Sequence, residues 1–245
     1  MITVSIDETG INQVKCFVTD FTDAMGYCEY KIPFFIQGVK AKKSEAMMIG
    51  TQHHEESEKL DRETAITVPL TKTKLENKKE DLNFVREDIQ TKFVYDFELP
   101  KGDAKLTLFG RADKVFRKKE MLIISDDKNT SRPERHDVMT EPYNDQLLQV
   151  LAYLHSEYYL GDSFGGWTKI PHKEKSYQIN IIDSKSKTIY KTYEDKVSKT
   201  HEKLLFDYTS QFTQKCLDWV SLNHHNSRAK CKACGFFDDC DEALR

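Results

Sequence analysis

An isolated acidic residue, Asp113, precedes an acidic pair and a lysine at Asp126-Asp127-Lys128. Alternating apolar and β-branched residues on both sides of a charged turn predict two adjacent strands across residues 110–130. In the second strand, the side-chain period of two puts Asp126 and Lys128 on one face and Asp127 on the other. If the first strand lays Asp113 beside Asp126, the two half-buried carboxylates repel each other. A divalent cation bound by their oxygens would relieve that repulsion.

This set of residues suits metal-assisted hydrolysis of a phosphodiester. The carboxylates would hold the cation, and the cation would polarise the phosphate and acidify a water molecule. The ammonium of Lys128 would stabilise the nucleophile or the negative charge that develops on the phosphate. We therefore predict that Asp113, Asp126 and Lys128 form the centre of a metal-dependent nuclease.

A histidine could complete this centre. His54 falls in a predicted helix over residues 44–62, and its imidazole could join Asp113 and Asp126 as a metal ligand if that helix packs across the sheet edge. The neighbouring histidine and glutamates superficially match a zinc protease. That class is excluded, because its helix needs a second histidine where this chain has Glu58.

Two polar residues lie on one face of a predicted helix over residues 142–160. Gln149 and Tyr153 stand four residues apart in an amphipathic segment, so their side chains are neighbours on the helix surface. Such pairs are common on exposed helices and carry little information alone. Placed against the acidic strands, however, Gln149 and Tyr153 could orient a phosphate or the attacking water.

Three cysteines cluster near the C-terminus at Cys231, Cys234 and Cys240. Neighbouring thiolates repel one another without a cation, so their spacing predicts a bound metal. Cys28 is the best candidate for a fourth ligand, and it would tie the two ends of the domain together. Four sulfur ligands suit an iron–sulfur cluster or zinc, and the spacing alone does not separate these two.

Composition predicts one globular domain. The chain has 245 residues, of which 38% are hydrophobic and 31% charged, enough to bury a core without disulfides. We expect residues 1–245 to form one nuclease domain, with Cys28 and residues 231–240 as a metal module. The net charge of −3 gives no general attraction to nucleic acid, so DNA contacts would depend on local basic patches or metal ions.

The sequence also bears on location. The first ten residues lack the basic region and apolar core of a signal peptide, and no apolar run reaches transmembrane length. We therefore expect an intracellular, cytoplasmic protein that does not contact a membrane. In such a compartment cysteines are more often metal ligands or buried thiols than disulfides, and Cys16 and Cys216 fall in apolar patterns typical of buried thiols.

Further elements are predicted around these residues. A short helix at 24–28, capped by Thr22 or Asp23, would end at Pro33. A hairpin over 93–108 would lead into the acidic strands, and turn-forming residues predict a loop at 129–137. Two more strands, at 177–182 and 188–193, would precede a long helix from Glu194.

The ordered set of motifs resembles the RecB-like nucleases of the PD-(D/E)xK superfamily that carry an iron–sulfur cluster. Among them it is most similar to the CRISPR-associated exonuclease family called Cas-four. The motifs, spread over roughly residues 17–240, are Cys28, Gly50-x3-His54, Gly110-x2-Asp113, Asp126-x-Lys128, Gln149-x3-Tyr153 and Cys231-x2-Cys234-x5-Cys240. Two departures are the YCEYK context of Cys28, where relatives often have proline and a basic residue, and Asp126, where relatives frequently have glutamate.

The resemblance implies a restriction-endonuclease-like mixed sheet flanked by helices, with an iron–sulfur module joining the N- and C-terminal segments. It also implies the role of each site residue. Magnesium or manganese would be bound by His54, Asp113, Asp126 and the backbone carbonyl of Asp127. Lys128 would be the catalytic lysine, with Gln149 and Tyr153 beside the DNA, and a 4Fe–4S cluster would be held by Cys28, Cys231, Cys234 and Cys240.

Three functions remain open at this point. The resemblance implies a DNA exonuclease acting on single strands or ends, with endonuclease activity also in the family, that trims spacer precursors alongside the CRISPR integrase. A stand-alone or viral exonuclease of repair or replication would have the same motifs. A non-catalytic module that binds DNA ends or the integrase is a third alternative, although such a module has no use for a repulsive carboxylate pair.

Overall fold

The computed structural model describes residues 1–42, 84–118, 120–161 and 166–245, with the backbone alone at 84–88. His54 and the helix predicted at 44–62 lie outside these residues.

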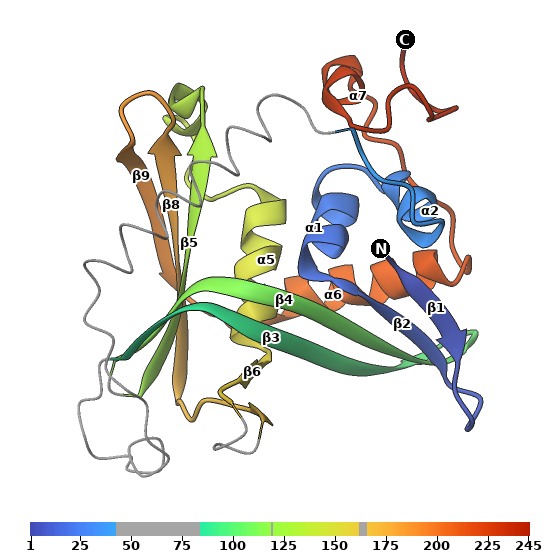
Figure 1. The fold of residues 1–245 in the computed structure, drawn as a ribbon, viewed down its shortest axis with the longest axis horizontal. Helices are drawn as coiled ribbons and strands as arrows, with labels where there is room; N and C mark the ends of the chain where they lie inside the picture. The colour runs from blue at the N-terminus through green and yellow to red at the C-terminus, as the bar shows by residue number, and fades with distance from the viewer. Residues whose placement is uncertain (43–83, 119, 162–165) are drawn as a thin grey trace.

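Strands of the described residues form one mixed sheet (Figure 1). They are β1 Thr3–Ile6, β2 Asn12–Phe17, β3 Phe84–Leu99, β4 Gly102–Lys118, β5 Met121–Thr130, β6 Glu157–Tyr159, β7 Trp167–Thr168, β8 Glu174–Asp183 and β9 Thr188–Lys196. Their order across the sheet is β7-β6-β3-β4-β5-β8-β9, and β2 pairs with both β1 and β4. The pairs β2–β4 and β5–β8 are parallel and the others are antiparallel.

Helices flank this sheet. They are α1 Val18–Gly26, α2 Lys31–Ile36, α5 Asn144–Leu154, α6 Lys199–Cys216 and α7 Arg228–Ala233, with a 3-10 turn at Pro133–His136. Helix α5 contacts β3, β4, β5 and β8, and α1 and α6 pack beside it (Figure 1). Its apolar stripe, which includes the fully buried Leu148 and Leu151, forms the centre of the core. The predicted mixed α/β fold with flanking helices is confirmed.

Strand β4 changes partner halfway along one of its edges. Residues 104–109 of β4 pair with β2, whereas residues 114–118 pair with β5. Between these two ladders, residues 110–113 of β4 pair with neither β2 nor β5. The ladder between β2 and β4 ends at the pair Phe17–Phe109. The chain then turns directly into α1 at Val18. The sheet therefore divides at the segment that contains Asp113.

The N-terminal helices and the C-terminal tail lie side by side, as Figure 1 shows for α2 and α7. The Tyr27 hydroxyl donates to the Lys230 carbonyl at 2.7 Å, and the rings of Phe34 and Phe236 stack with centroids 4.7 Å apart. The buried Lys215 ammonium lies 2.8 Å from the Glu29 carboxylate. These contacts hold the segment around Cys28 against the segment that contains the other three cysteines of the motif.

Two predictions for the N-terminal helices were wrong. Helix α1 begins at Val18 instead of residue 24, because its first turn already buries Val18 and Phe21. Pro33 does not end a helix. It occupies the third position of α2, in the first turn, where the proline's missing N–H would have no intrahelical partner anyway.

Two later helix boundaries also differ from the prediction. Helix α5 ends at Leu154 instead of residue 160, because Tyr158 pairs with Thr91 of β3 and buries its ring in the sheet. Helix α6 begins at Lys199 instead of Glu194, because β9 continues to Lys196 and Ser198 then caps the helix. The hairpin and the strands around 110–130, 177–182 and 188–193 were predicted correctly. Strand β5 and the 3-10 turn occupy most of the loop predicted at 129–137.

Candidate active site

Asp113 and Asp126 lie where β4 and β5 separate. The ladder between these strands ends at the pair Lys114–Ser125, and Asp113 and Asp126 are the next residue on each strand. Continuing the register by one position places them opposite each other, and directly opposed residues of an antiparallel pair project from the same face. Asp126 is 1% exposed and Asp113 is partly exposed. The two carboxylates therefore face the same opening in the sheet.

A network of polar side chains surrounds Asp126. The Lys128 Nζ lies 2.7 Å from Asp126 Oδ2 and donates to Gln149 Oε1 at 2.8 Å. Gln149 Nε2 in turn lies 3.3 Å from the Tyr153 hydroxyl and 3.5 Å from Asp126 Oδ1. Helix α5 thus brings two of its residues onto the strand that carries Asp126 and Lys128. The structure places these four predicted residues, with Asp113, around one centre.

The charges at this centre act on one another. Burial disfavours the ammonium of Lys128, but the carboxylate of Asp126, with smaller effects of Asp113 and Asp145, raises the lysine's pKa. Burial raises the pKa of Tyr153, and the charges of Asp126 and Asp113 add to that increase. Lys128 is therefore a cation and Tyr153 a neutral hydroxyl at neutral pH. Asp113 lies close enough to influence both.

Asp145 was missed by the sequence analysis. It lies in the first turn of α5, where the preceding prolines and turn residues mark only a helix start. Burial raises its pKa, while Lys128 acts in the opposite direction. Its backbone and Cβ pack against Gly26 of α1 so closely that a Cβ at Gly26 would lie 2.4 Å from the Asp145 Cβ. A third carboxylate therefore borders the centre, and no motif in the sequence indicated it.

Asp127 projects from the opposite face of β5. Its carboxylate accepts from Asn180 Nδ2 at 2.8 Å and pairs with the Lys114 ammonium at 3.2 Å. Both charges are half-buried, with side-chain exposures of 14% for Asp127 and 21% for Lys114. The side chain of Asp127 thus stabilises the junction of β4, β5 and β8, and the role predicted for its backbone carbonyl stays a prediction.

Gly110 explains how Tyr153 reaches the sheet. A Cβ at position 110 would lie 2.7 Å from Cε1 of Tyr153 and 3.1 Å from Cγ2 of Val18. Both distances are shorter than ordinary van der Waals contact. The glycine of the Gly110-x2-Asp113 motif therefore makes room for the Tyr153 ring beside the carboxylates.

Asp126 fits a metal ligand on the evidence of its own contacts. Its Oδ2 is buried and accepts no hydrogen bond of good geometry among the described residues, although the Lys128 ammonium is near. A buried carboxylate needs a positive charge beside it, and the Lys128 ammonium supplies one. A hard divalent ion bound by oxygens of Asp113 and Asp126 would balance the second carboxylate on the same face, which a single ammonium does not.

The four cysteines of the motif come together where the α1–α2 connection meets the C-terminal tail. Cys28 and Cys231 are buried, and Cys234 and Cys240 are partly exposed. Burial raises the pKa of the Cys28 thiol, and Cys234 and Cys240 raise it further. Because Cys28 comes from the α1–α2 connection and the other three from the C-terminal tail, this group joins the two ends of the chain. By contrast, Cys16 and Cys216 are buried in the core, as predicted.

Two histidines at this centre were not singled out from the sequence. Ligand atoms of Cys28, His224 and His225 all lie within 4.8 Å of one another. The Cys231 Sγ lies 3.5 Å from Nε2 of His224 and 3.9 Å from Nε2 of His225. Thiolates and imidazoles together are the donors that bind zinc and other soft metals, so this Cys/His group could hold a metal. The sequence feature that could have indicated them is the pair of adjacent histidines seven and six residues before Cys231.

Comparison with known proteins gives the fold and little else. No protein-family model matches the sequence, and no curated protein matches it. The crystal structure of SSO0001 aligns over 94% of this chain and 88% of its own, with 15% identity and a TM-score of 0.50. A structure from Eubacterium rectale named "Putative exonuclease" aligns over 93% and 88%, with 12% identity and a TM-score of 0.45. At such identities the likeness shows the fold alone.

Within the part of the chain that the structure describes, no helix combines the length and the hydrophobicity needed to cross a lipid bilayer.

Proposed function

We propose that this protein is a metal-dependent deoxyribonuclease that hydrolyses phosphodiesters of single-stranded DNA or DNA ends. One observation carries the proposal. Asp113 and Asp126 share one face where β4 and β5 separate, and Lys128 lies 2.7 Å from the more buried carboxylate. Burying two acidic groups and a lysine destabilises the fold. Their arrangement therefore indicates a site that binds a cation and a phosphate.

The chain's own residues would divide the work as follows. Asp113 and Asp126 would hold magnesium or manganese, and His54 is a further candidate ligand. When bound, the cation would polarise the phosphate and lower the pKa of a water molecule. Lys128, charged at neutral pH, would stabilise negative charge that develops on the phosphate oxygens.

Gln149 would keep Lys128 in place. Its Oε1 accepts from the Lys128 Nζ, and its Nε2 points to Asp126 and Tyr153. A lysine side chain is flexible, so a fixed acceptor lowers the entropic cost of holding the ammonium beside the carboxylates. The buried Tyr153 hydroxyl would orient the amide of Gln149 and exclude water from the back of the centre.

The cysteine centre would have a structural role. Four thiolates fit a 4Fe–4S cluster, as the resemblance to the Cas-four family implies, and the nearby imidazoles also admit zinc. With Cys28 and Cys231 as ligands, the group would fasten the α1–α2 connection to the tail. Helix α1, which leads into that connection, packs against α5, the helix that positions Gln149. Metal loss would therefore loosen the active site indirectly.

The proposal is tested by digestion of single-stranded DNA that is labelled at either end, with manganese present or chelated. We expect metal-dependent cleavage that releases label from one end first, which also gives the polarity. Trimming of spacer precursors together with the CRISPR integrase is the finer proposal, and it needs co-purification of that integrase. Tight binding of DNA ends without cleavage would favour the non-catalytic module instead.

A further inference from the structure

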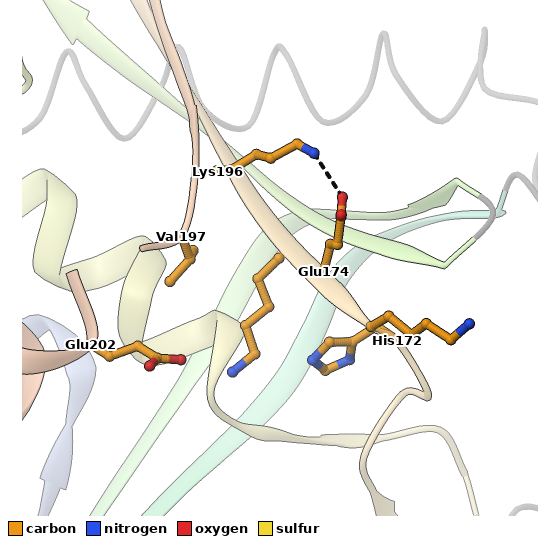
Figure 2. A pocket seen from close by; sticks show the side chains of 7 residues that line it. His172, Glu174, Lys196, Val197 and Glu202 are labelled. Atoms are coloured by element: carbon orange, nitrogen blue, oxygen red, sulfur yellow. Dashed lines mark hydrogen bonds and ion pairs between the residues drawn. The ribbon is translucent and has the colours of Figure 1, made fainter. Parts of the chain in front are cut away.

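A cavity lies on the sheet face that carries Asp126, toward the other end of β5 and β8. Its volume is about 420 Å³, and Figure 2 shows its wall. The lining residues are His172, Lys173, Glu174, Lys175, Lys196, Val197 and Glu202. In the parallel ladder between β5 and β8, Lys175 pairs with Leu122 and Ile179 pairs with Asp126. The four-residue offset separates the cavity from the candidate active site by roughly 13 Å.

Part of the charge on the wall is already balanced. The Lys196 ammonium lies 2.9 Å from the Glu174 carboxylate, the pair joined by the dashed line in Figure 2, and both side chains are exposed. Lys173 pairs in the same way with Glu120 at 2.8 Å, outside the cavity wall. These two pairs lie at the surface and need no further partner.

Two other cations at or behind the wall, Lys175 and Arg117, have no ion pair among the described residues. Lys175 is half-buried, and among the described residues no carboxylate lies within ion-pair distance of its ammonium. Arg117, in the same sheet row as Leu122 and Lys175, is 3% exposed, and its Nε makes no hydrogen bond in the described part of the chain. His155, at the end of α5, likewise has a buried Nε2 without a partner there. A buried donor that lacks an acceptor costs free energy.

These groups influence one another strongly enough to be neighbours. Burial lowers the pKa of His155, and Lys175, His172 and Lys169 lower it further. Burial also lowers the pKa of His172, with contributions from Lys175 and Arg117, although its hydrogen bond to the Ile170 carbonyl acts in the opposite direction. Glu202 is the acidic group that favours the charged form of Lys175. With their pKa values lowered, His155 and His172 are neutral imidazoles at neutral pH, so the positive charge at this cavity is that of Lys175 and of Arg117 behind it, and Glu202 is the acidic group that faces Lys175.

We propose that this cavity binds a phosphate monoester, with Lys175 and His172 as its contacts and Arg117 as a buried charge behind them. A phosphate carries close to two negative charges at neutral pH and has several acceptor oxygens, so it offsets more of this positive charge than a chloride or a carboxylate.

Binding of inorganic phosphate and of adenosine 5′-monophosphate, measured by calorimetry in EDTA at constant ionic strength, tests the proposal. EDTA removes the cation of the candidate active site, so the result does not depend on nuclease activity. We expect both ligands to bind the wild type, and to bind more tightly than chloride. Binding to Lys175→Gln and His172→Gln should be weaker by about tenfold or more.

Lys185→Gln is the matched control, because Lys185 is exposed at the far end of the same strand pair. This control should bind phosphate like the wild type. Should Lys175→Gln fail to fold, acetylation of the wild-type lysines supplies a second measurement, in which phosphate should protect Lys175 and leave Lys185 reactive. Phosphate that binds no better than chloride, or equal weakening in the Lys185 control, would overturn the proposal.

Discussion

The Nζ of Lys128 lies 2.7 Å from Oδ2 of Asp126, and the two residues project from one face of β5. The carboxylate is 1% exposed, whereas the lysine side chain is 27% exposed. The pair therefore lies at the boundary between the core and solvent. A divalent cation held by Asp126 would compete with the ammonium for the same carboxylate, which leaves the positive charge of Lys128 for the phosphate.

Replacing Gln149 by alanine should lower the rate of DNA cleavage by about 10- to 100-fold, as loss of an outer partner commonly does. The variant loses the acceptor at 2.8 Å from Lys128, so the ammonium is held less well. Single-turnover kinetics measure the effect. Gln214→Ala is the control, because the Gln214 side chain donates only to Ser210 of its own helix among the described residues. A rate equal to that of the control would contradict the role given to Gln149.

Gly110→Ala should destabilise the fold by about 1–3 kcal/mol, because the added methyl group overpacks against the Tyr153 ring. The free energy of unfolding in urea measures the change. Combining it with Tyr153→Leu should recover part of the loss, since the smaller side chain frees the space. Fully additive losses in the double variant would show that Tyr153 is not what the methyl group meets.

The free energy of unfolding should fall as the pH drops from about 6.5 to about 4. Burial lowers the pKa of His155 to about 4, so in this range the unfolded chain binds a proton that the folded chain does not. The loss from this group is roughly 2–4 kcal/mol when complete, and it saturates below the folded pKa. Urea titrations at several pH values should give a flatter profile for His155→Leu. An unchanged profile would mean that His155 titrates freely in the folded protein.

Metal content should depend on Cys28 and Cys231 and should not depend on Cys16. Cys28→Ser and Cys231→Ser remove donors of the Cys/His group, whereas Cys16 is buried in the core away from it. Elemental analysis of anaerobically purified protein gives the result, and a brown colour that Cys234→Ser bleaches would identify an iron–sulfur cluster. A colourless protein with stoichiometric zinc would exclude iron. Equal metal content in Cys28→Ser and Cys16→Ala would show that Cys28 is not part of a metal centre.

Much of the site could be predicted because local rules govern it. The strand period fixes the faces of Asp126 and Lys128, and the helix period places Gln149 beside Tyr153. The strands around 110–130 and 177–193 follow from alternating apolar residues. By contrast, the early end of α5 depends on Tyr158 pairing with Thr91 across the sheet. The sequence around residues 154–160 does not indicate a pairing with a strand so distant along the chain.

The missed residues share one cause. Asp145 borders the centre because α1 packs against α5 through Gly26, and His224 and His225 meet Cys231 because the tail folds back. Both depend on tertiary packing, which sequence spacing does not encode. The partner change along β4, which opens the sheet at Asp113, is likewise a property of the assembled strands.

Manganese-dependent digestion of end-labelled single-stranded DNA by the wild type, Asp113→Ala and Lys128→Ala tests the central claim most directly. The proposed roles predict cleavage by the wild type and a loss of at least about 100-fold in each variant, with DNA binding largely retained. Asp207→Asn, which alters an exposed ion pair on α6, should cut normally. Undiminished cleavage by both Asp113→Ala and Lys128→Ala would contradict the assignment of this site.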